Sequence, residues 1–133
     1  MIGLDSNCLL RYLVRDDEKQ YAQIARRIAA AADARDAFYI NHIVLCELVW
    51  VLTQGYGFAK PDVCATLDIL LASGAFQFEQ RATVMGALAD YKTATVGFAD
   101  CLIAQKNALA GCDKTLTFDK RAKRIPDFEV MSH

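Results

Sequence analysis

Four acidic residues stand where predicted secondary-structure elements begin or end, or inside an otherwise apolar segment: Asp5, Glu47, Asp100 and Asp119. Asp5 follows a short apolar run at the amino end of the chain, and Asp119 follows the β-type run 116–118. Asp100 lies in the first turn of residues 98–110, whose apolar positions recur with a helical period. The carboxyl ends of parallel strands meet at one edge of an α/β sheet, where ligands bind. We therefore expect these carboxylates to lie at that edge.

Glu47 is the sharpest anomaly in the sequence. It is the only charged residue between Asn41 and Gln54, and it lies inside the apolar stretch 43–52. A carboxylate in an apolar environment is costly unless it is paired, bound to a metal or protonated. A solvent-exposed position or a pairing with an arginine explains the same residue without any function, so the pattern alone leaves both interpretations open.

Carboxylates that converge on one place repel one another unless a divalent cation lies between them. Carboxylate oxygens are hard ligands that suit Mg²⁺ or Mn²⁺. Such ions orient and activate a water and stabilise the attacking and leaving oxygens when a phosphodiester is hydrolysed. This chemistry needs no histidine base, and the chain has only His42 and His133. The four acids therefore predict metal-dependent phosphoryl transfer.

The elements that position these acids alternate between strands and helices. The predicted strands cover residues 1–4, 37–40, 76–79, 114–118 and 128–131. The predicted helices cover residues 8–14, 17–32, 41–54, 61–71, 82–91 and 98–110. Ser6 and Asn7 offer capping chemistry before the first helix, and Asn41 caps the third. The alternation predicts an α/β fold, with a parallel sheet and helices on both of its faces.

Composition limits the classes of protein that fit. The chain has 133 residues, of which 54% are hydrophobic, and it shows no repeat or linker, so we expect a single domain over residues 1–133. The net charge of −1 gives no general case for a nucleic-acid or membrane partner. Five cysteines without a C-x-x-C pair indicate free thiols in a reducing compartment. With no signal-peptide pattern and no long apolar run, we expect a soluble cytoplasmic protein.

The acidic motifs together resemble those of PIN-domain nucleases, and the compact size resembles VapC-type toxins of bacterial toxin–antitoxin pairs. Four motifs, spread over nearly the whole chain, carry the resemblance: Leu4-Asp5-Ser6-Asn7, Val44-Leu45-Cys46-Glu47-Leu48, Asp100-Cys101-Leu102-Ile103-Ala104 and Thr117-Phe118-Asp119. The resemblance implies a three-layer α/β/α sandwich with a central, mainly parallel sheet. It also implies an endoribonuclease that depends on Mg²⁺ or Mn²⁺. The residues that would bind the metal and carry out catalysis are Asp5, Glu47, Asp100 and Asp119.

Supporting residues and partners follow from the same resemblance. Asn7 and Thr117 match polar neighbours of the family's acids and can orient a carboxylate or a water, although capping and turn formation explain them equally well. The implied partners are an RNA substrate, a cognate antitoxin protein and a second copy of the chain in a homodimer. Residues 43–52 are apolar in nearly every helical direction, which a dimer interface, an antitoxin groove or deep burial in a monomer each explain.

An RNA substrate needs positively charged partners for its phosphates. The residues around Asp119 are rich in basic side chains, namely Lys114, Lys120, Arg121, Lys123 and Arg124. Arg11 and Arg15 on the first predicted helix are further candidates. A solvated surface explains any one of these residues without an RNA contact.

Two other functions compete with RNA cleavage. A haloacid-dehalogenase-like phosphatase also has a nucleophilic aspartate after its first strand, but it expects a second acid two residues later, where this chain has Asn7. A non-catalytic module that binds RNA or protein would need no divalent ion and would tolerate the loss of Asp100. These alternatives belong to different classes, and dependence on a metal separates them.

Overall fold

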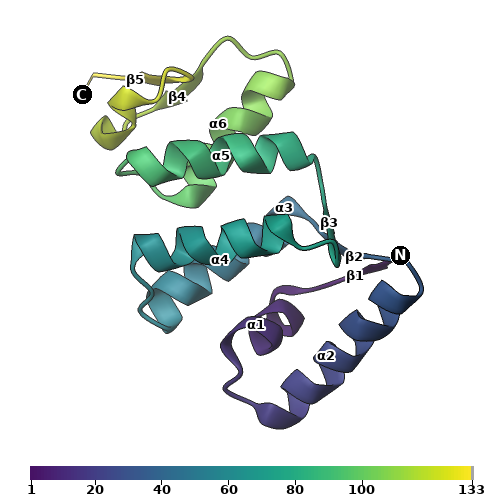
Figure 1. Cartoon of the computed structure of the whole chain (residues 1–133). Coiled ribbons are helices and arrows are strands. Elements are labelled where there is room, and N and C mark those ends of the chain that lie inside the picture. Colours follow the sequence, from purple (N-terminus) through teal and green to yellow (C-terminus); the bar gives the residue numbers. More distant parts are fainter. Residues whose placement is uncertain (133) are drawn as a thin grey trace. The chain divides into compact units, whose positions relative to one another are not determined.

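The structure is a computed structural model that describes residues 1–132, and it divides into two compact units. The first unit covers Met1–Glu79 and the second begins at Gln80. Figure 1 labels the helices and strands of both. The prediction of a single domain stays a prediction, and each unit is described by itself.

The first unit contains a three-stranded parallel sheet with the order β1-β2-β3. Its strands are β1 (Ile2–Gly3), β2 (Phe38–Ile40) and β3 (Phe76–Phe78). Ile2 pairs with Phe38, and Phe38 pairs with Phe76, all in parallel register. Parallel strands need crossover connections, and helices supply them here. Phe38, Ile40, Phe76 and Phe78 are buried, so the sheet carries part of the core.

Four α-helices and one short π-helix complete the first unit: α1 (Ser6–Val14), α2 (Glu18–Asp33), α3 (His42–Trp50), η1 (Val51–Gly55) and α4 (Lys60–Ala72). Asp5, Asp17 and Asn41 cap the first three α-helices, each accepting a hydrogen bond from the backbone N–H three residues later. Asp5 therefore caps α1, whereas the sequence had suggested Ser6 and Asn7, and the helix begins two residues earlier than predicted.

The third helix also differs from the prediction of one helix over residues 41–54. Its α-helical part ends at Trp50, and a π-helical turn continues to Gly55. The Thr53 hydroxyl donates to the carbonyl oxygens of Val49 and Trp50, at 2.9 and 3.1 Å, and such bonds from a side chain compete with the regular helix pattern. The Tyr56 N–H bonds to the Val51 oxygen at 3.0 Å, which is the wider spacing of a π-turn.

The second unit holds two helices, a 3₁₀ turn and a two-stranded parallel sheet: α5 (Arg81–Thr93), α6 (Phe98–Leu109), β4 (Thr115–Thr117), η2 (Lys120–Arg124) and β5 (Phe128–Val130). α5 and α6 pack closely at Gly86. A Cβ atom placed there would lie only 2.8 Å from the Gln105 side chain of the other helix. Tyr91 and Phe98 meet edge to face, with ring centroids 5.9 Å apart.

The class of fold predicted from the sequence is confirmed. Both units contain parallel strands joined by helical segments, which is the α/β pattern that the sequence predicted. The strands lie within about two residues of their predicted positions. Among the described residues, no helix is both long and apolar enough to cross a membrane.

Candidate functional site

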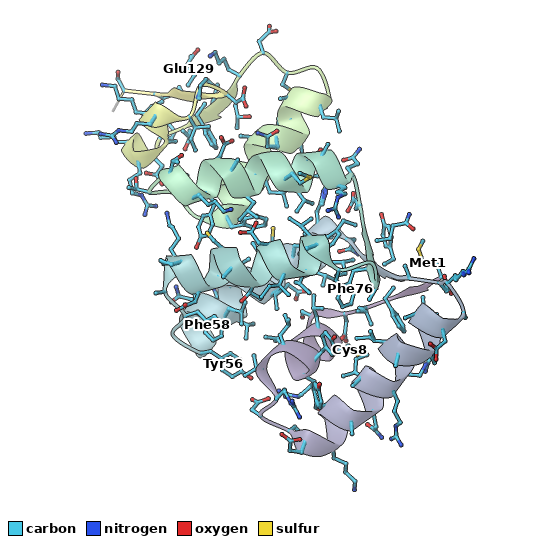
Figure 2. The ribbon with its side chains drawn as sticks, viewed as in Figure 1. Met1, Cys8, Tyr56, Phe58, Phe76 and Glu129 are labelled. Atoms are coloured by element: carbon cyan, nitrogen blue, oxygen red, sulfur yellow. The ribbon has the colours of Figure 1, made fainter. Side chains whose placement is uncertain are left out.

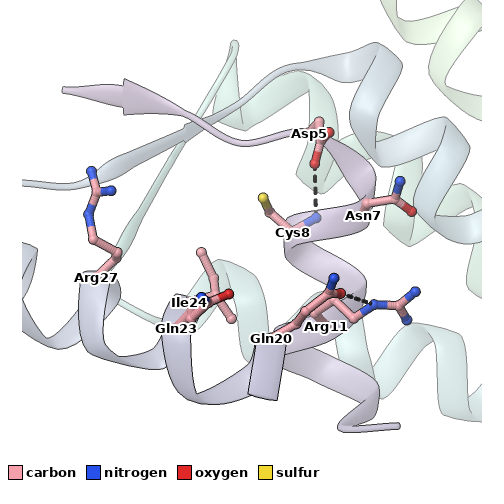
Figure 3. A pocket seen from close by; sticks show the side chains of 8 residues that line it. All are labelled: Asp5, Asn7, Cys8, Arg11, Gln20, Gln23, Ile24 and Arg27. Atoms are coloured by element: carbon pink, nitrogen blue, oxygen red, sulfur yellow. Dashed lines mark hydrogen bonds between the residues drawn. The ribbon is translucent and has the colours of Figure 1, made fainter. Parts of the chain in front are cut away.

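Asp5 stands directly after the first strand. The Leu4 N–H bonds to the Tyr39 oxygen at 2.9 Å and extends the parallel pairing to the residue before Asp5. The Asp5 Oδ1 atom then accepts the Cys8 N–H at 2.9 Å, so the carboxylate lies at the N-terminus of α1 (Figure 3). The helix dipole favours negative charge there, and the side chain is exposed. Asp5 is therefore the N-cap of α1, and its role as a metal ligand stays a prediction.

Two neighbours of Asp5 share its surroundings. Cys8 lies one turn further along α1, where loss of hydration and a hydrogen bond to Asp5 raise the pKa of its thiol. A raised pKa keeps the thiol protonated, so Cys8 is a poor nucleophile. Asn7 lies on the first turn of the same helix and lines the same pocket as Asp5 (Figure 3). Asn7 and Asp5 thus line one pocket, and the predicted role of Asn7 in orienting a carboxylate or a water stays a prediction.

Glu47 does not lie in the apolar environment that its sequence neighbours suggested. It is exposed on α3, whereas Leu45 and Leu48 are fully buried. Ile43 and Trp50, four residues before it and three after it, have exposed fractions of 72% and 66%. Residues three or four apart lie on the same face of a helix. Glu47 therefore lies on the exposed face of α3, between these two large apolar side chains. Glu47 therefore reaches solvent and is not desolvated by its apolar sequence neighbours, and its role as a metal ligand stays a prediction.

Asp100 lies in the first turn of α6 and is half-buried. Its Oδ2 atom would lie 3.6 Å from a Cβ atom placed on Gly97, the N-cap of the helix, so the carboxylate folds back over the helix N-terminus. Phe98 and Cys101 are buried on either side and fix the start of the helix. Asp100 is therefore held in place at a position where the helix dipole stabilises its charge.

Asp119 caps the 3₁₀ turn η2 and forms a two-point ion pair with Arg121. Its Oδ1 atom accepts the Arg121 backbone N–H at 2.9 Å, and its Oδ2 atom accepts Nη2 at 2.7 Å. These hydrogen bonds hold the pKa of Asp119 below its usual range. The Asp119 N–H in turn donates to the Thr117 hydroxyl at 3.1 Å, so Thr117 has the turn-forming role that the sequence left open.

Arg121 links the two acids of the second unit. The Asp119 carboxylate raises the pKa of the guanidinium, and the charge of Asp100 adds a smaller contribution in the same direction. Arg121 therefore lies within electrostatic reach of both predicted metal ligands in this unit. Within each unit, no three His, Cys, Asp or Glu side chains of the described residues form a metal-binding group.

The other basic residues have varied surroundings. Arg15 stacks over Tyr21 at 3.8 Å, and Lys114 donates to the Pro126 oxygen at 2.6 Å. Lys120 and Lys123 are exposed and line a shallow hollow beside β5, and Arg124 is exposed on η2. The RNA contacts proposed for these residues stay predictions.

Sequence reasoning missed a contact between buried His42 and half-buried Glu79 that joins α3 to the end of β3. The His42 N–H donates to the Glu79 Oε1 atom at 2.9 Å, and the His42 Nε2 atom lies 2.8 Å from the Glu79 carbonyl oxygen. His42 has an exposed fraction of 4%, so its ring is built into the fold and is not available as a catalytic base. In the sequence, only the position of His42 next to the helix cap Asn41 pointed to this contact.

Comparison with known proteins places the chain in a family. The profile of the PIN domain family matches residues 2–127. A protein named VapC ribonuclease, from Aquifex aeolicus (strain VF5), is 25% identical over 122 residues, which cover 92% of this chain and 90% of that protein. No solved structure matches the chain. Because the family profile covers nearly all of the sequence, the chain belongs to the PIN domain family.

Proposed function

We propose that this protein is a metal-dependent endoribonuclease that hydrolyses RNA phosphodiester bonds and acts as the toxin of a bacterial toxin–antitoxin pair. Membership of the PIN domain family and similarity to a VapC ribonuclease support a nuclease. The observation that carries the proposal is the presence of the four acids on which the resemblance to PIN-domain nucleases rests: Asp5, Glu47, Asp100 and Asp119. The same similarity supports RNA as substrate and a cognate antitoxin as partner.

The proposal assigns these four carboxylates to Mg²⁺ or Mn²⁺. Their chemistry fits, because all are oxygen donors that are exposed or half-buried. A bound divalent ion would supply activation of the attacking water and stabilisation of the charge on the phosphate. Arg121 is the residue that such an ion must compete with at Asp119, since it already holds both carboxylate oxygens.

Other residues of the chain would position the reacting groups. The backbone bonds at Asp5 and Asp119 fix two of the carboxylates. Asn7, beside Asp5, would orient a carboxylate or a water. The exposed basic residues of η2 would hold the RNA backbone. The exposed face of α3 with Ile43 and Trp50 favours a protein contact, with the antitoxin or with a second copy of the chain in a homodimer.

The phosphatase alternative loses support, because the family match covers residues 2–127 and is to PIN domains. A non-catalytic PIN module stays the competing function. Single-stranded RNA incubated with the purified chain separates the two, in Mg²⁺ or Mn²⁺, in excess chelator, and after metal is added back. Metal-restored cleavage that leaves no 2′,3′-cyclic phosphate supports hydrolysis by activated water. Cleavage that persists in chelator, or no cleavage at all, would contradict the proposal.

A further inference from the structure

A pocket of about 320 Å³, lined mostly by polar and charged residue types, lies between α1 and α2 in the first unit. One wall consists of Asp5 and the residues of α1 that follow it, and the other consists of a single face of α2. Eight residues line it: Asp5, Asn7, Cys8, Arg11, Gln20, Gln23, Ile24 and Arg27. Figure 3 shows Arg11 and Arg27 at opposite ends, with Cys8 and Ile24 between them. The sequence did not predict this pocket.

Arg11 is held at its end of the pocket by hydrogen bonds. Its Nε atom donates to the Gln20 Oε1 atom at 2.7 Å, and its Nη1 atom donates to the Asp16 Oδ1 atom at 2.9 Å. The Tyr56 hydroxyl donates to the Asp16 Oδ2 atom at 2.6 Å. Tyr56 itself packs edge-on against Phe58, and both are labelled in Figure 2. The guanidinium is thus fixed before any ligand arrives, which lowers the entropy that binding would cost.

The lining indicates what this pocket would bind. It contains two guanidinium groups and one carboxylate, and guanidinium groups recognise phosphates. The amides of Asn7, Gln20 and Gln23 offer both donors and acceptors, as the edge of a nucleobase requires. No aromatic residue lines the pocket, so stacking of a base on an aromatic ring is excluded here. The chemistry favours an anionic ligand with a hydrogen-bonding edge.

The size of the pocket favours a single nucleotide over a protein helix as its ligand. Ligand pockets range from about 300 to 1,000 Å³, so this one is at the small end. A docked amphipathic helix needs an extended apolar groove for several successive anchors. Only Ile24 and Cys8 are apolar here, and arginines stand at both ends. A single nucleotide fits these features better than an antitoxin helix does.

We propose that this pocket binds one nucleotide of single-stranded RNA beside the phosphodiester that is cleaved. Arg11 and Arg27 bind the phosphates on either side of that nucleotide, and the Gln23 amide bonds to the edge of its base. The inference rests on the proposed nuclease function, because Asp5 belongs both to the metal-binding set and to the pocket wall. The bound base would then give the cleavage site a nucleotide preference.

Two neighbouring arginines of α2 give a matched test. Arg26 and Arg27 are both exposed, but only Arg27 lines the pocket. A labelled 2′-O-methyl RNA oligonucleotide of mixed sequence is titrated with the full chain in chelator, and its fluorescence anisotropy gives the Kd. Arg27→Ala should raise the Kd about 5- to 10-fold and reduce the slope of log K against log salt by roughly 0.7, as the loss of one phosphate contact to a single strand does. Arg26→Ala should change the Kd less than twofold.

Cleavage-site sequencing on a random RNA pool then tests the base contact. The native chain should prefer one base at a fixed position beside the cut, and Gln23→Ala should weaken that preference about 10-fold. Equal Kd values for Arg26→Ala and Arg27→Ala, or an unchanged preference in Gln23→Ala, would overturn the proposal. If Arg27→Ala binds RNA like Arg26→Ala but no longer binds the cognate antitoxin, the pocket is a protein-docking surface and the proposal is wrong.

The two proposals fail in different ways. Equal RNA affinities of the two arginine variants, together with intact metal-dependent cleavage, would contradict the nucleotide pocket and leave the nuclease function standing. A clear difference in affinity without any metal-dependent cleavage would contradict the nuclease function and leave the pocket as an RNA-binding site.

Discussion

Arg121 forms a bidentate ion pair with the carboxylate of Asp119, with Nη2 2.7 Å from Oδ2 and Nε 3.0 Å from Oδ1. The charge of Asp100 also raises the pKa of this guanidinium. An arginine thus supplies positive charge to both acids of the second unit that are predicted to bind a metal. A divalent cation would have to displace this arginine from the Asp119 carboxylate or share the carboxylate with it.

Removal of Arg121 should therefore strengthen metal binding. Arg121→Ala frees the Asp119 carboxylate from its competitor, so the Kd for Mn²⁺ should fall by about two- to fivefold, a modest gain because the ion pair is exposed. Isothermal titration calorimetry measures the change. Lys123→Ala is the matched control, since it removes one positive charge from the same 3₁₀ turn without touching Asp119. Equal Kd values for the two variants would show that Arg121 does not compete with the metal.

The ionisation of Asp119 should depend on the same contact. Arg121 lowers the pKa of Asp119 in the folded chain, so the ion pair contributes stability above the ordinary aspartate pKa of about 3.9 and loses it as the pH falls through the lower folded value. Carboxyl NMR titration should place the pKa of Asp119 below that of a free aspartate in the native chain. In Arg121→Ala the pKa should return towards the ordinary value, and no change on substitution would contradict the assignment.

Asp5 should have two separable roles. As the N-cap of α1 it accepts the Cys8 N–H, and replacing a capping side chain by alanine costs about 1 kcal/mol. Asp5→Ala should therefore lower the free energy of unfolding by about that amount, measured by urea denaturation. Asn is an equally good cap, so Asp5→Asn should cost only a few tenths of a kcal/mol. Both variants should lose RNA cleavage. A fully active Asp5→Asn enzyme would remove Asp5 from the proposed metal site.

Much of this arrangement could be predicted from the sequence, because it depends on local patterns. The runs before Asp5 and Asp119 have strand character, and both acids cap the turns that follow. The position of Asp100 in a helix's first turn followed from the periodicity of residues 98–110. Local sequence fixes such placements, since caps and turns need only neighbouring residues.

The prediction that was wrong and the features that were missed all concern packing. Glu47 looked buried because its sequence neighbours are apolar, but the environment of a helical residue is set by the face it lies on. The contact between Arg121 and Asp119 requires the 3₁₀ turn, since residues two apart do not face each other in a regular helix. The pocket beside Asp5 requires α1 and α2 to pack together, and no local pattern encodes which residues then line the gap.

The basic residues of the 3₁₀ turn should affect substrate binding more than chemistry. Lys123→Ala should raise KM several-fold, leave kcat nearly unchanged and soften the dependence of binding on salt, as the loss of a phosphate contact does. Lys19→Ala serves as control, because Lys19 is exposed on α2 and does not line the pocket. A fall in kcat with KM unchanged would assign Lys123 to the reaction itself.

The most direct test of the metal-dependent nuclease compares two aspartates of the second unit. Asp100→Asn and Asp113→Asn each remove one negative charge, but only Asp100 belongs to the proposed metal ligands, and Asp113 is exposed after α6. Single-turnover cleavage of single-stranded RNA in saturating Mn²⁺ should slow by about 10²- to 10³-fold in Asp100→Asn, the loss expected when one stabilising group is removed from a reaction centre. The rate of Asp113→Asn should stay within twofold of the native rate. Equal rates for the two variants, or cleavage that survives chelation of the metal, would contradict the account.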